Sequence, residues 1–164
     1  MADVLTPEQR RLNMSRIRGK NTKPELVLRR GLHAKGFRFQ LHRRDLPGRP
    51  DLVFPRYRSV ILVHGCFWHG HGCSLTKMPA TRPDFWAAKI ANNRDHDQRV
   101  LVALHGAGWR TLVVWECAIR GPNRQSEDVV LSSCIKFLER TGSAAQEIAG
   151  GFPTADRGSP PRWV

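Results

Sequence analysis

Residues 64–73 bring together more metal-binding and proton-accepting side chains than any other segment of this 164-residue sequence. The segment reads HGCFWHGHGC, and the spacing of Cys66, His71 and Cys73 suits a tetrahedral thiolate and imidazole site such as structural zinc. A fourth ligand must come from elsewhere, and Cys117, just after an expected strand, is the best candidate. Free buried cysteines and a disulfide are the alternatives, although a reducing cytoplasm disfavours the disulfide.

Two further histidines of the segment, His64 and His69, are left free by such a site and indicate proton transfer. Asp51 begins one expected strand and the neighbouring strand ends at His64, so a carboxylate, a strand-end carbonyl and two imidazoles can converge. Oxygen ligands suit hydrated Mg²⁺, and an imidazole, with an ordinary pKa of about 6.5, can take a proton from water. Beside a basic surface, this combination predicts phosphodiester hydrolysis.

Two more carboxylates each have a catalytic and a structural interpretation. Asp97, on an expected helix, either accepts the second ring N–H of His69 or pairs at the surface with Arg94 or Arg99. Glu25 either completes the capping box of a helix or faces a metal-bound water, and the two roles are compatible.

These side chains need a scaffold of alternating helices and strands. Hydrophobic periodicity and cap residues predict helices at residues 22–33, 84–105 and 126–140, and a short helix or ordered arm at residues 6–20. Strands are expected at residues 37–41, 51–54, 60–63 and 111–115. This order predicts an α/β fold of three layers, with a mixed central β-sheet flanked by helices. The side chains expected in the core include Phe85, Ile90, Leu101 and Leu104 of the long helix, together with Trp109 and Cys134.

Positive charge is concentrated in the N-terminal third of the chain. Lys and Arg number 27 against 14 Asp and Glu, and residues 1–58 alone hold 15 against 5, a net charge of +10. Arginine supplies 21 of the positive groups, and its planar fork binds phosphate oxygens in pairs, which favours nucleic acid over a membrane surface. No apolar run reaches the roughly 18 to 20 residues of a membrane span or resembles a secretory signal, so we expect a cytoplasmic protein.

Phe67 and Trp68 are adjacent aromatic residues on a glycine-flanked loop, from which both cannot easily reach a core. Core burial is the ordinary interpretation of an aromatic side chain. The alternative is a wedge that enters a base step and unstacks it, at a cost of roughly a few kcal/mol that is lowest at a mispair. Trp86, near a helix start, is expected to join them.

Four motifs taken together resemble the very-short-patch-repair (Vsr) mismatch endonucleases: LPGRPDLVF, HGCFWHGHGC, PATRPDFWAAKIANN and GWRTLVVWECAIRG. They occur in order and at compatible spacing within residues 13–121. The resemblance implies a fold related to restriction endonucleases and an enzyme that nicks one DNA strand 5′ to the thymine of a T:G mispair. Such a mispair arises when 5-methylcytosine is deaminated, and the nick initiates very short patch repair.

The resemblance also implies roles for individual residues. Those acting on the phosphate are Asp51 and the Val63 carbonyl as ligands of two Mg²⁺ ions, His69 as the base, Asp97 as its orienting group, and His64 and Glu25 as phosphate and water contacts. One Zn²⁺ ion would bind Cys66, His71, Cys73 and Cys117. The positions matching DNA contacts are Phe67, Trp68, Trp86, Met14, Lys89 and Asn93. From charge alone, Arg16 and Arg18 are expected to bind DNA phosphates.

Three regions are expected: a basic arm at residues 1–20 that contacts DNA, a catalytic domain at residues 21–141 and a flexible tail at residues 142–164. The resemblance implies duplex DNA as substrate, mismatch-repair proteins and a DNA polymerase as partners, and a monomer associated with a prokaryotic nucleoid. Two other functions fit part of the pattern. One is a restriction-type nuclease that cuts both strands at a specific sequence, and the other is a zinc-stabilised DNA-binding module without catalysis.

Overall fold

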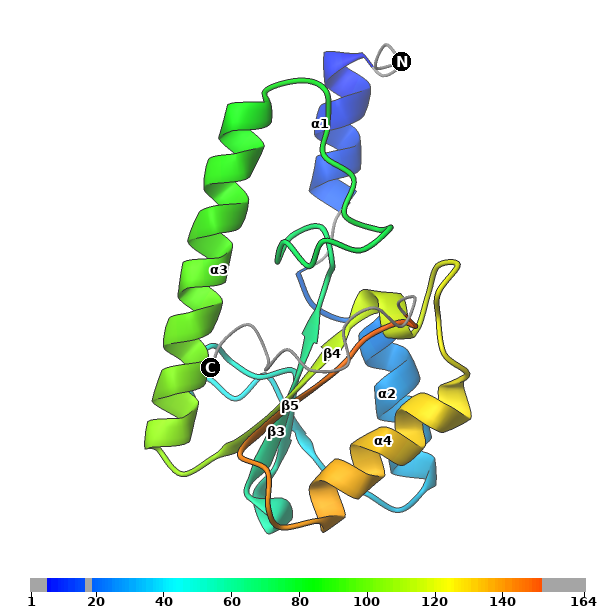
Figure 1. Cartoon of the computed structure of the whole chain (residues 1–164), viewed down its shortest axis with the longest axis vertical. Helices are drawn as coiled ribbons and strands as arrows, with labels where there is room; N and C mark the ends of the chain where they lie inside the picture. Colours follow the sequence, from blue (N-terminus) through cyan, green and yellow to red (C-terminus); the bar gives the residue numbers. More distant parts are fainter. Residues whose placement is uncertain (1–5, 17–18, 152–164) are drawn as a thin grey trace.

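A mixed β-sheet lies between helices in the computed structural model, which describes residues 6–16 and 19–151 (Figure 1). Within these ranges the helices are α1 (Pro7–Arg16), α2 (Lys23–Ala34), α3 (Pro83–Gly106) and α4 (Glu127–Glu139). The strands are β1 (Gln40–Leu41), β2 (Leu52–Phe54), β3 (Ser59–His64), β4 (Arg110–Trp115) and β5 (Ala145–Ile148). Short 3₁₀ turns, η1 (Pro55–Tyr57) and η2 (Glu116–Ala118), follow β2 and β4. None of the described helices is both long and apolar enough to cross a membrane.

The sheet has the strand order β1-β2-β3-β4-β5, and β2 runs opposite to the other four strands. The first three strands form an antiparallel meander, whereas β3, β4 and β5 run parallel. In the central pair, Ser59 lies opposite Arg110 and His64 lies opposite Trp115. Because parallel strands of equal length end at the same edge, the segments that follow β3 and β4 leave the sheet side by side.

Helices cover both faces of the sheet, because alternate side chains of each buried strand point to opposite faces. On one face, Val60 and Val113 pack with Leu104 and its neighbours on α3. On the other face, Ile61 and Leu112 pack against α2 and α4. Figure 1 shows α3 on one side of the strands and α2 with α4 on the other. The predicted three-layer α/β architecture is confirmed.

The start of α2 follows from its cap residues. Thr22 is the N-cap, and its hydroxyl accepts a hydrogen bond from the backbone N–H of Glu25 at 3.5 Å. The Glu25 carboxylate accepts in turn from the backbone N–H of Asn21, at 2.9 Å. Glu25 is therefore a buried residue that helps to cap the start of α2, which agrees with the structural interpretation of this carboxylate.

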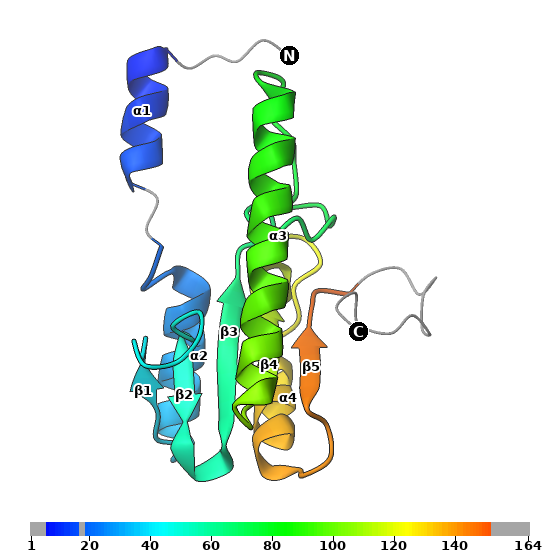
Figure 2. The ribbon, with the colours of Figure 1, turned by 90° about the vertical axis from the view of Figure 1, so that its left-hand side faces the viewer.

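α1 and the first half of α3 both extend beyond the sheet, at the end where β3 and β4 terminate (Figure 2). Leu12 and Met14 of α1 are exposed. Phe85 was expected in the core, and this expectation is wrong: its side chain is 44% exposed. Phe85 lies in the first turn of α3, beyond the sheet, so no strand lies beneath it, whereas Ile90, Leu101 and Leu104 further along α3 are buried.

The prediction of a flexible tail at residues 142–164 is wrong for its first part, because residues 145–148 form β5. This strand pairs parallel to β4, with Ala145 opposite Thr111 and Ile148 opposite Val114. Its polar sequence, AQEI, carries little strand signal, and the pairing is decided by the exposed edge of β4. Residues 152–164 lie outside the described part of the chain.

The packing of α2 on α4 generates a stability prediction. A Cβ atom on Gly31 would lie 2.4 Å from Cδ1 of Leu131, which is buried on α4. We expect Gly31→Ala to lower the free energy of unfolding by about 1–3 kcal/mol, because overpacking outweighs the gain in helix propensity. Gly106→Ala on α3, where a Cβ meets nothing within 4 Å, is the matched control and should be neutral or slightly stabilising. Urea denaturation compares them, and equal stabilisation by both substitutions would contradict the prediction.

Candidate active site and metal centre

The loop at residues 65–73 folds back over the sheet edge directly after β3. The backbone N–H of His69 donates to the carbonyl of Gly65 at 3.2 Å, and that of His71 donates to the carbonyl of Cys66 at 3.0 Å. Gly70 has a positive φ of 62°, and a Cβ there would lie 2.6 Å from Cγ2 of Ile90. A glycine at this position therefore allows the loop to pack closely against α3.

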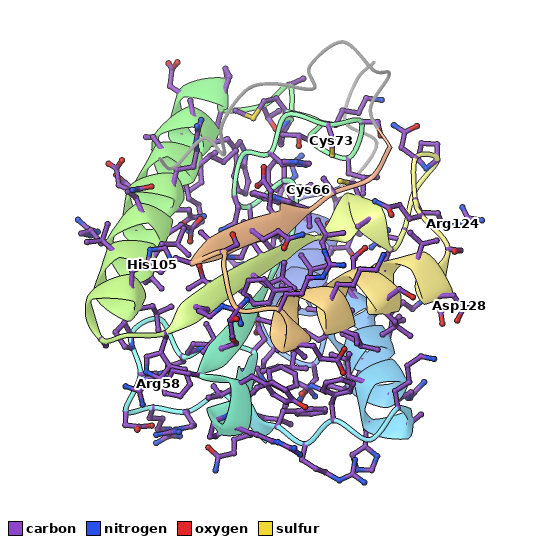
Figure 3. All side chains as sticks on the ribbon, turned by 60° about the horizontal axis from the view of Figure 1, so that its bottom comes forward. Arg58, Cys66, Cys73, His105, Arg124 and Asp128 are labelled. Atoms are coloured by element: carbon purple, nitrogen blue, oxygen red, sulfur yellow. The ribbon has the colours of Figure 1, made fainter. Side chains whose placement is uncertain are left out.

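Four side chains from this loop and from η2 form a metal-binding group. One ligand atom each of Cys66, His71, Cys73 and Cys117 lies within 4.8 Å of the others, and Figure 3 shows Cys66 and Cys73 on the loop beyond the sheet. All four cysteines of the chain lie among the described residues and are free of disulfide bonds. The fourth, Cys134, is buried in the core cluster of α2 and α4, as predicted.

The surroundings of this group suit metal-bound thiolates. Three sulfur atoms accept backbone N–H groups: Sγ of Cys66 from Cys117 at 3.3 Å, Sγ of Cys73 from Leu75 at 3.4 Å, and Sγ of Cys117 from Gly150 at 3.2 Å. Hydrogen bonding from Cys66, aided by His71 and the Gly150 amide, holds the pKa of the Cys117 thiol below its ordinary value. A buried anionic sulfur needs a positive partner, and a divalent cation with tetrahedral preference supplies one.

Next to this group, two histidines and an aspartate form a second cluster. Nδ1 of His69 lies 2.5 Å from Oδ2 of Asp97 on α3, and the ring of His69 stacks on that of His64 with centroids 3.9 Å apart. The hydrogen bond to a carboxylate fixes the proton of neutral His69 on Nδ1 and leaves Nε2 with its lone pair. Burial lowers the pKa of His64 to about 3, so His64 is neutral at physiological pH.

Asp51 immediately precedes β2 and lies at the same end of the sheet as these histidines. Its Oδ2 accepts the backbone N–H of Val63 at 2.7 Å. Burial raises the pKa of Asp51 to about 7, although the Val63 hydrogen bond acts in the opposite direction. A pocket of about 740 Å³ contains this carboxylate and the second cluster. The side chains at its walls include Asp51, His64, His69 and Asp97, and its basic residues Lys20, Arg44 and Arg49.

Glu25 belongs to a third group of polar side chains near the pocket. Two members of this group, Arg29 and His42, were not predicted as site residues from the sequence. Arg29 donates to Oε2 of Glu25 at 2.8 Å, and its guanidinium also lies 3.0 Å from Nε2 of His42. Nδ1 of His42 lies 3.8 Å from Oδ1 of Asp51. His42 could have been found from the sequence if the expected strands at residues 37–41 and 51–54 had been paired. The antiparallel pairing of Leu41 with Leu52 brings the next residue, His42, opposite Asp51.

Trp115 lies between the metal-binding group and the cluster of His64, His69 and Asp97, and the sequence did not predict this role. Its ring stacks on that of His71 at 4.1 Å and lies edge-on to that of His64 at 5.3 Å. The indole N–H donates to Oε2 of Glu147 on β5 at 2.9 Å. A sequence pattern shows only a tryptophan at the end of a buried strand, so its contact with the histidines depends on tertiary structure.

The aromatic residues proposed as a wedge form a separate cluster beside the pocket. Phe67, Trp68 and Trp86 contact one another edge to face, with centroids 5.1–5.9 Å apart, and all three are half-buried outside the two main core clusters. Asn93, expected to face DNA bases, donates to the Trp68 carbonyl at 2.8 Å. Lys89, one turn away on α3, is exposed.

The N-terminal candidates are described only in part. Met14 lies exposed on α1, and Arg16 is the last residue of that helix. Arg18 lies outside the described residues.

Comparison with known proteins identifies relatives along most of the chain. A family model described as "DNA mismatch endonuclease Vsr" matches residues 2–75. The chain is 55% identical to the type II nicking enzyme V.XorIIP of Xanthomonas oryzae over 119 residues, which cover 73% of this chain and 88% of that protein. It is 42% identical to the DNA mismatch endonuclease Vsr of Escherichia coli over 146 residues, covering 89% of this chain and 94% of that protein. With these identities and this coverage, the chain belongs to the Vsr family of DNA mismatch endonucleases.

Proposed function

We propose that this DNA endonuclease nicks one strand of duplex DNA 5′ to the thymine of a T:G mispair and thereby initiates very short patch repair. The observation that carries the proposal is a single pocket that contains Asp51, His64, His69 and Asp97, next to the half-buried aromatic cluster. A hydrolytic group beside aromatic side chains suits an enzyme that must act only where stacking is disturbed. Relatives whose names state mismatch endonuclease and nicking activity support the same proposal.

Asp51 and the backbone carbonyl of Val63 would hold Mg²⁺, in two ions if the family pattern applies. The fit is chemical: a largely enclosed carboxylate, 16% exposed, whose pKa is raised to about 7 is stabilised as an anion by a cation. Bound Mg²⁺ supplies neutralisation of the phosphate charge and acidification of water. The basic residues at the rim, Lys20, Arg44 and Arg49, would hold the DNA backbone across the pocket.

His69 would accept the proton of the attacking water at Nε2, because Asp97 keeps the ring proton on Nδ1. His64, buried and neutral, would keep the His69 ring in place through the stacked contact and leave no second positive charge beside the developing imidazolium. Glu25 would orient a water on the far side of Asp51.

Zn²⁺ would bind the sulfurs and the imidazole of Cys66, Cys73, Cys117 and His71 in a structural role. The four ligands leave no open coordination position, and the N–H groups directed at the sulfurs stabilise bound thiolates. Zinc would thereby fix the loop that carries His69 together with Phe67 and Trp68 of the aromatic cluster.

Phe67, Trp68 and Trp86 would enter the base stack at the mispair, and Met14 on α1 would approach from the other groove. Arg16 and Arg18 would bind phosphates, and Lys89 and Asn93 would lie near the bases, with Asn93 also holding the Trp68 loop. We infer a cytoplasmic, nucleoid-associated monomer with a DNA-contacting arm at residues 1–20 and a catalytic domain that begins at residue 21 and includes β5. It would hand the nick to mismatch-repair proteins and a DNA polymerase.

With Mg²⁺ and a T:G duplex, we expect a nick in the thymine-containing strand and no cut in the matched T:A duplex, as read by strand-specific end labels. Equal cutting of both duplexes would contradict the proposal. A restriction-type nuclease would instead cut both strands and tolerate Trp68→Ala, whereas a wedge role predicts that this variant loses mismatch cleavage.

For the proposed base, we expect His69→Ala to lower the single-turnover nicking rate by about 10²–10⁴-fold with little change in DNA affinity. Asp97→Asn should also lower the rate, because an amide no longer fixes the ring tautomer. Asp95→Asn, an exposed neighbour on α3, is the matched control and should cut like the unaltered protein. If the Asp97 and Asp95 variants cut equally well, Asp97 has no orienting role.

For the metal centre, we expect one zinc ion per purified chain by elemental analysis. Cys117→Ser should lose most of this zinc and lower the melting temperature, because a structural metal contributes directly to folding. Cys134→Ala, a change of a buried cysteine outside the cluster, should retain it. Full zinc content in the Cys117 variant would exclude the proposed ligand set.

A further inference from the structure

His42 has an unusual backbone conformation beside the pocket. Its φ of 47° lies in the left-handed region, which a residue with a Cβ adopts only at a cost. The residue follows β1, lines the pocket and is only 24% exposed. Strained positions of this kind persist where the resulting side-chain direction is useful.

The position of Arg29 determines which ring nitrogen of His42 carries the proton. A guanidinium has only N–H donors, and its Nη2 lies 3.0 Å from Nε2 of His42, so Nε2 must accept. The neutral ring therefore carries its hydrogen on Nδ1. That nitrogen lies 3.8 Å from Oδ1 of Asp51.

This tautomer excludes His42 as a metal ligand, although Glu25, His42 and Asp51 lie close enough together to hold an ion. Arg29 occupies one lone pair, and a proton occupies the other nitrogen. The remaining N–H of the ring is instead near the Asp51 carboxylate, 3.8 Å from Oδ1 and so beyond direct hydrogen-bond distance, while Oδ2 accepts from the Val63 N–H at 2.7 Å.

Arg29 itself is held in place by the start of α2. Its Nη1 donates to Oδ1 of Asn21 at 2.7 Å, and its Nη2 donates to Oε2 of Glu25 at 2.8 Å. Asn21 also has a positive φ, of 58°. Two partners besides His42 therefore hold the guanidinium in place, so that it is a fixed hydrogen-bond donor to the histidine.

We propose that Arg29 and His42 form a positioning relay for Asp51, in which Arg29 fixes the His42 tautomer and the Nδ1–H of His42, 3.8 Å from Oδ1 in the structure, closes to a hydrogen bond that orients Oδ1 when a cation binds. The inference rests on the proposed role of Asp51 as a cation ligand. His42 is a positioning residue, because it acts through Asp51 and does not touch the cation.

Mn²⁺ binding to the full chain without DNA, measured by electron paramagnetic resonance, tests the relay. His42→Leu removes the donor and should weaken Mn²⁺ affinity about 10- to 100-fold, as loss of an outer-shell partner does. His42→Gln can accept from Arg29 and donate to Asp51, so it should recover most of the affinity. His33→Gln, an exposed histidine on α2 outside the pocket, is the control and should bind like the unaltered protein.

His42→Gly separates the role in cation binding from a role in folding. Glycine tolerates the positive φ, so this variant should melt above His42→Leu, yet its Mn²⁺ affinity should be equally weakened. A purely structural His42 would give the reverse, with affinity following melting temperature. Wild-type affinity in either the Leu or the Gly variant would overturn the relay.

Asp51→Asn distinguishes failure of the relay from failure of the proposed function. If this variant loses Mn²⁺ binding and His42→Leu does not, the relay alone is wrong. If Asp51→Asn binds Mn²⁺ normally, the cation role of Asp51 is wrong and the relay falls with it. In the expected case both variants lose affinity, and the Mg²⁺ concentration for half-maximal nicking rises in His42→Leu while the rate at saturating Mg²⁺ changes little.

Discussion

The parallel, in-register pairing of β3 with β4 is the constraint on which both clusters depend. It places His64 opposite Trp115, so that the loop after β3 and the 3₁₀ turn after β4 leave the sheet at one edge. Cys117 can then meet Cys66 across the two segments, with a backbone N–H to sulfur bond of 3.3 Å between them. A shift of one residue in this register would exchange the two faces of β3 and separate the ligands.

Trp115 makes the two clusters mechanically dependent on each other. Its ring lies between His71 of the metal-binding group and His64 of the pocket. Its indole N–H donates a hydrogen bond to Glu147 on β5, which fixes the ring. The Gly150 amide, just past the same strand, donates to Cys117. The last strand of the sheet is polar and short, yet it contacts the supporting residues of both clusters.

The charge balance of the pocket is the ground for the proposed cation. The Asp51 side chain is only 16% exposed, and the guanidinium of Arg29 is already engaged with Glu25 and Asn21. Burial therefore dominates and raises the pKa of Asp51 to about 7. The exposed basic residues of the pocket, Lys20, Arg44 and Arg49, suit phosphate, and the raised pKa of Asp51 is the observation behind the proposed divalent ion.

The sequence predicts most of the scaffold because its strongest signals are local. The Thr22 cap, the buried run of β3 and the periodicity of α3 each depend on neighbours along the chain. The convergence of Cys117 with the loop after β3 was also predicted, because the expected strand before Cys117 could run beside the strand before the loop, and the two strands do pair in parallel. Phe85 and β5 were predicted wrongly, since a hydrophobic side chain beyond the sheet edge and a polar strand on an open edge are decided by tertiary context.

The most direct measurement is a crystal structure of the protein with Mn²⁺ and a T:G duplex, with the ion located by anomalous scattering. We predict an anomalous peak at about 2.0–2.6 Å from a carboxylate oxygen of Asp51 and from the Val63 carbonyl, with the phosphate 5′ to the thymine between that ion and Nε2 of His69. A phosphate bound away from this pocket, or an ion that ignores Asp51, would contradict the proposed mechanism.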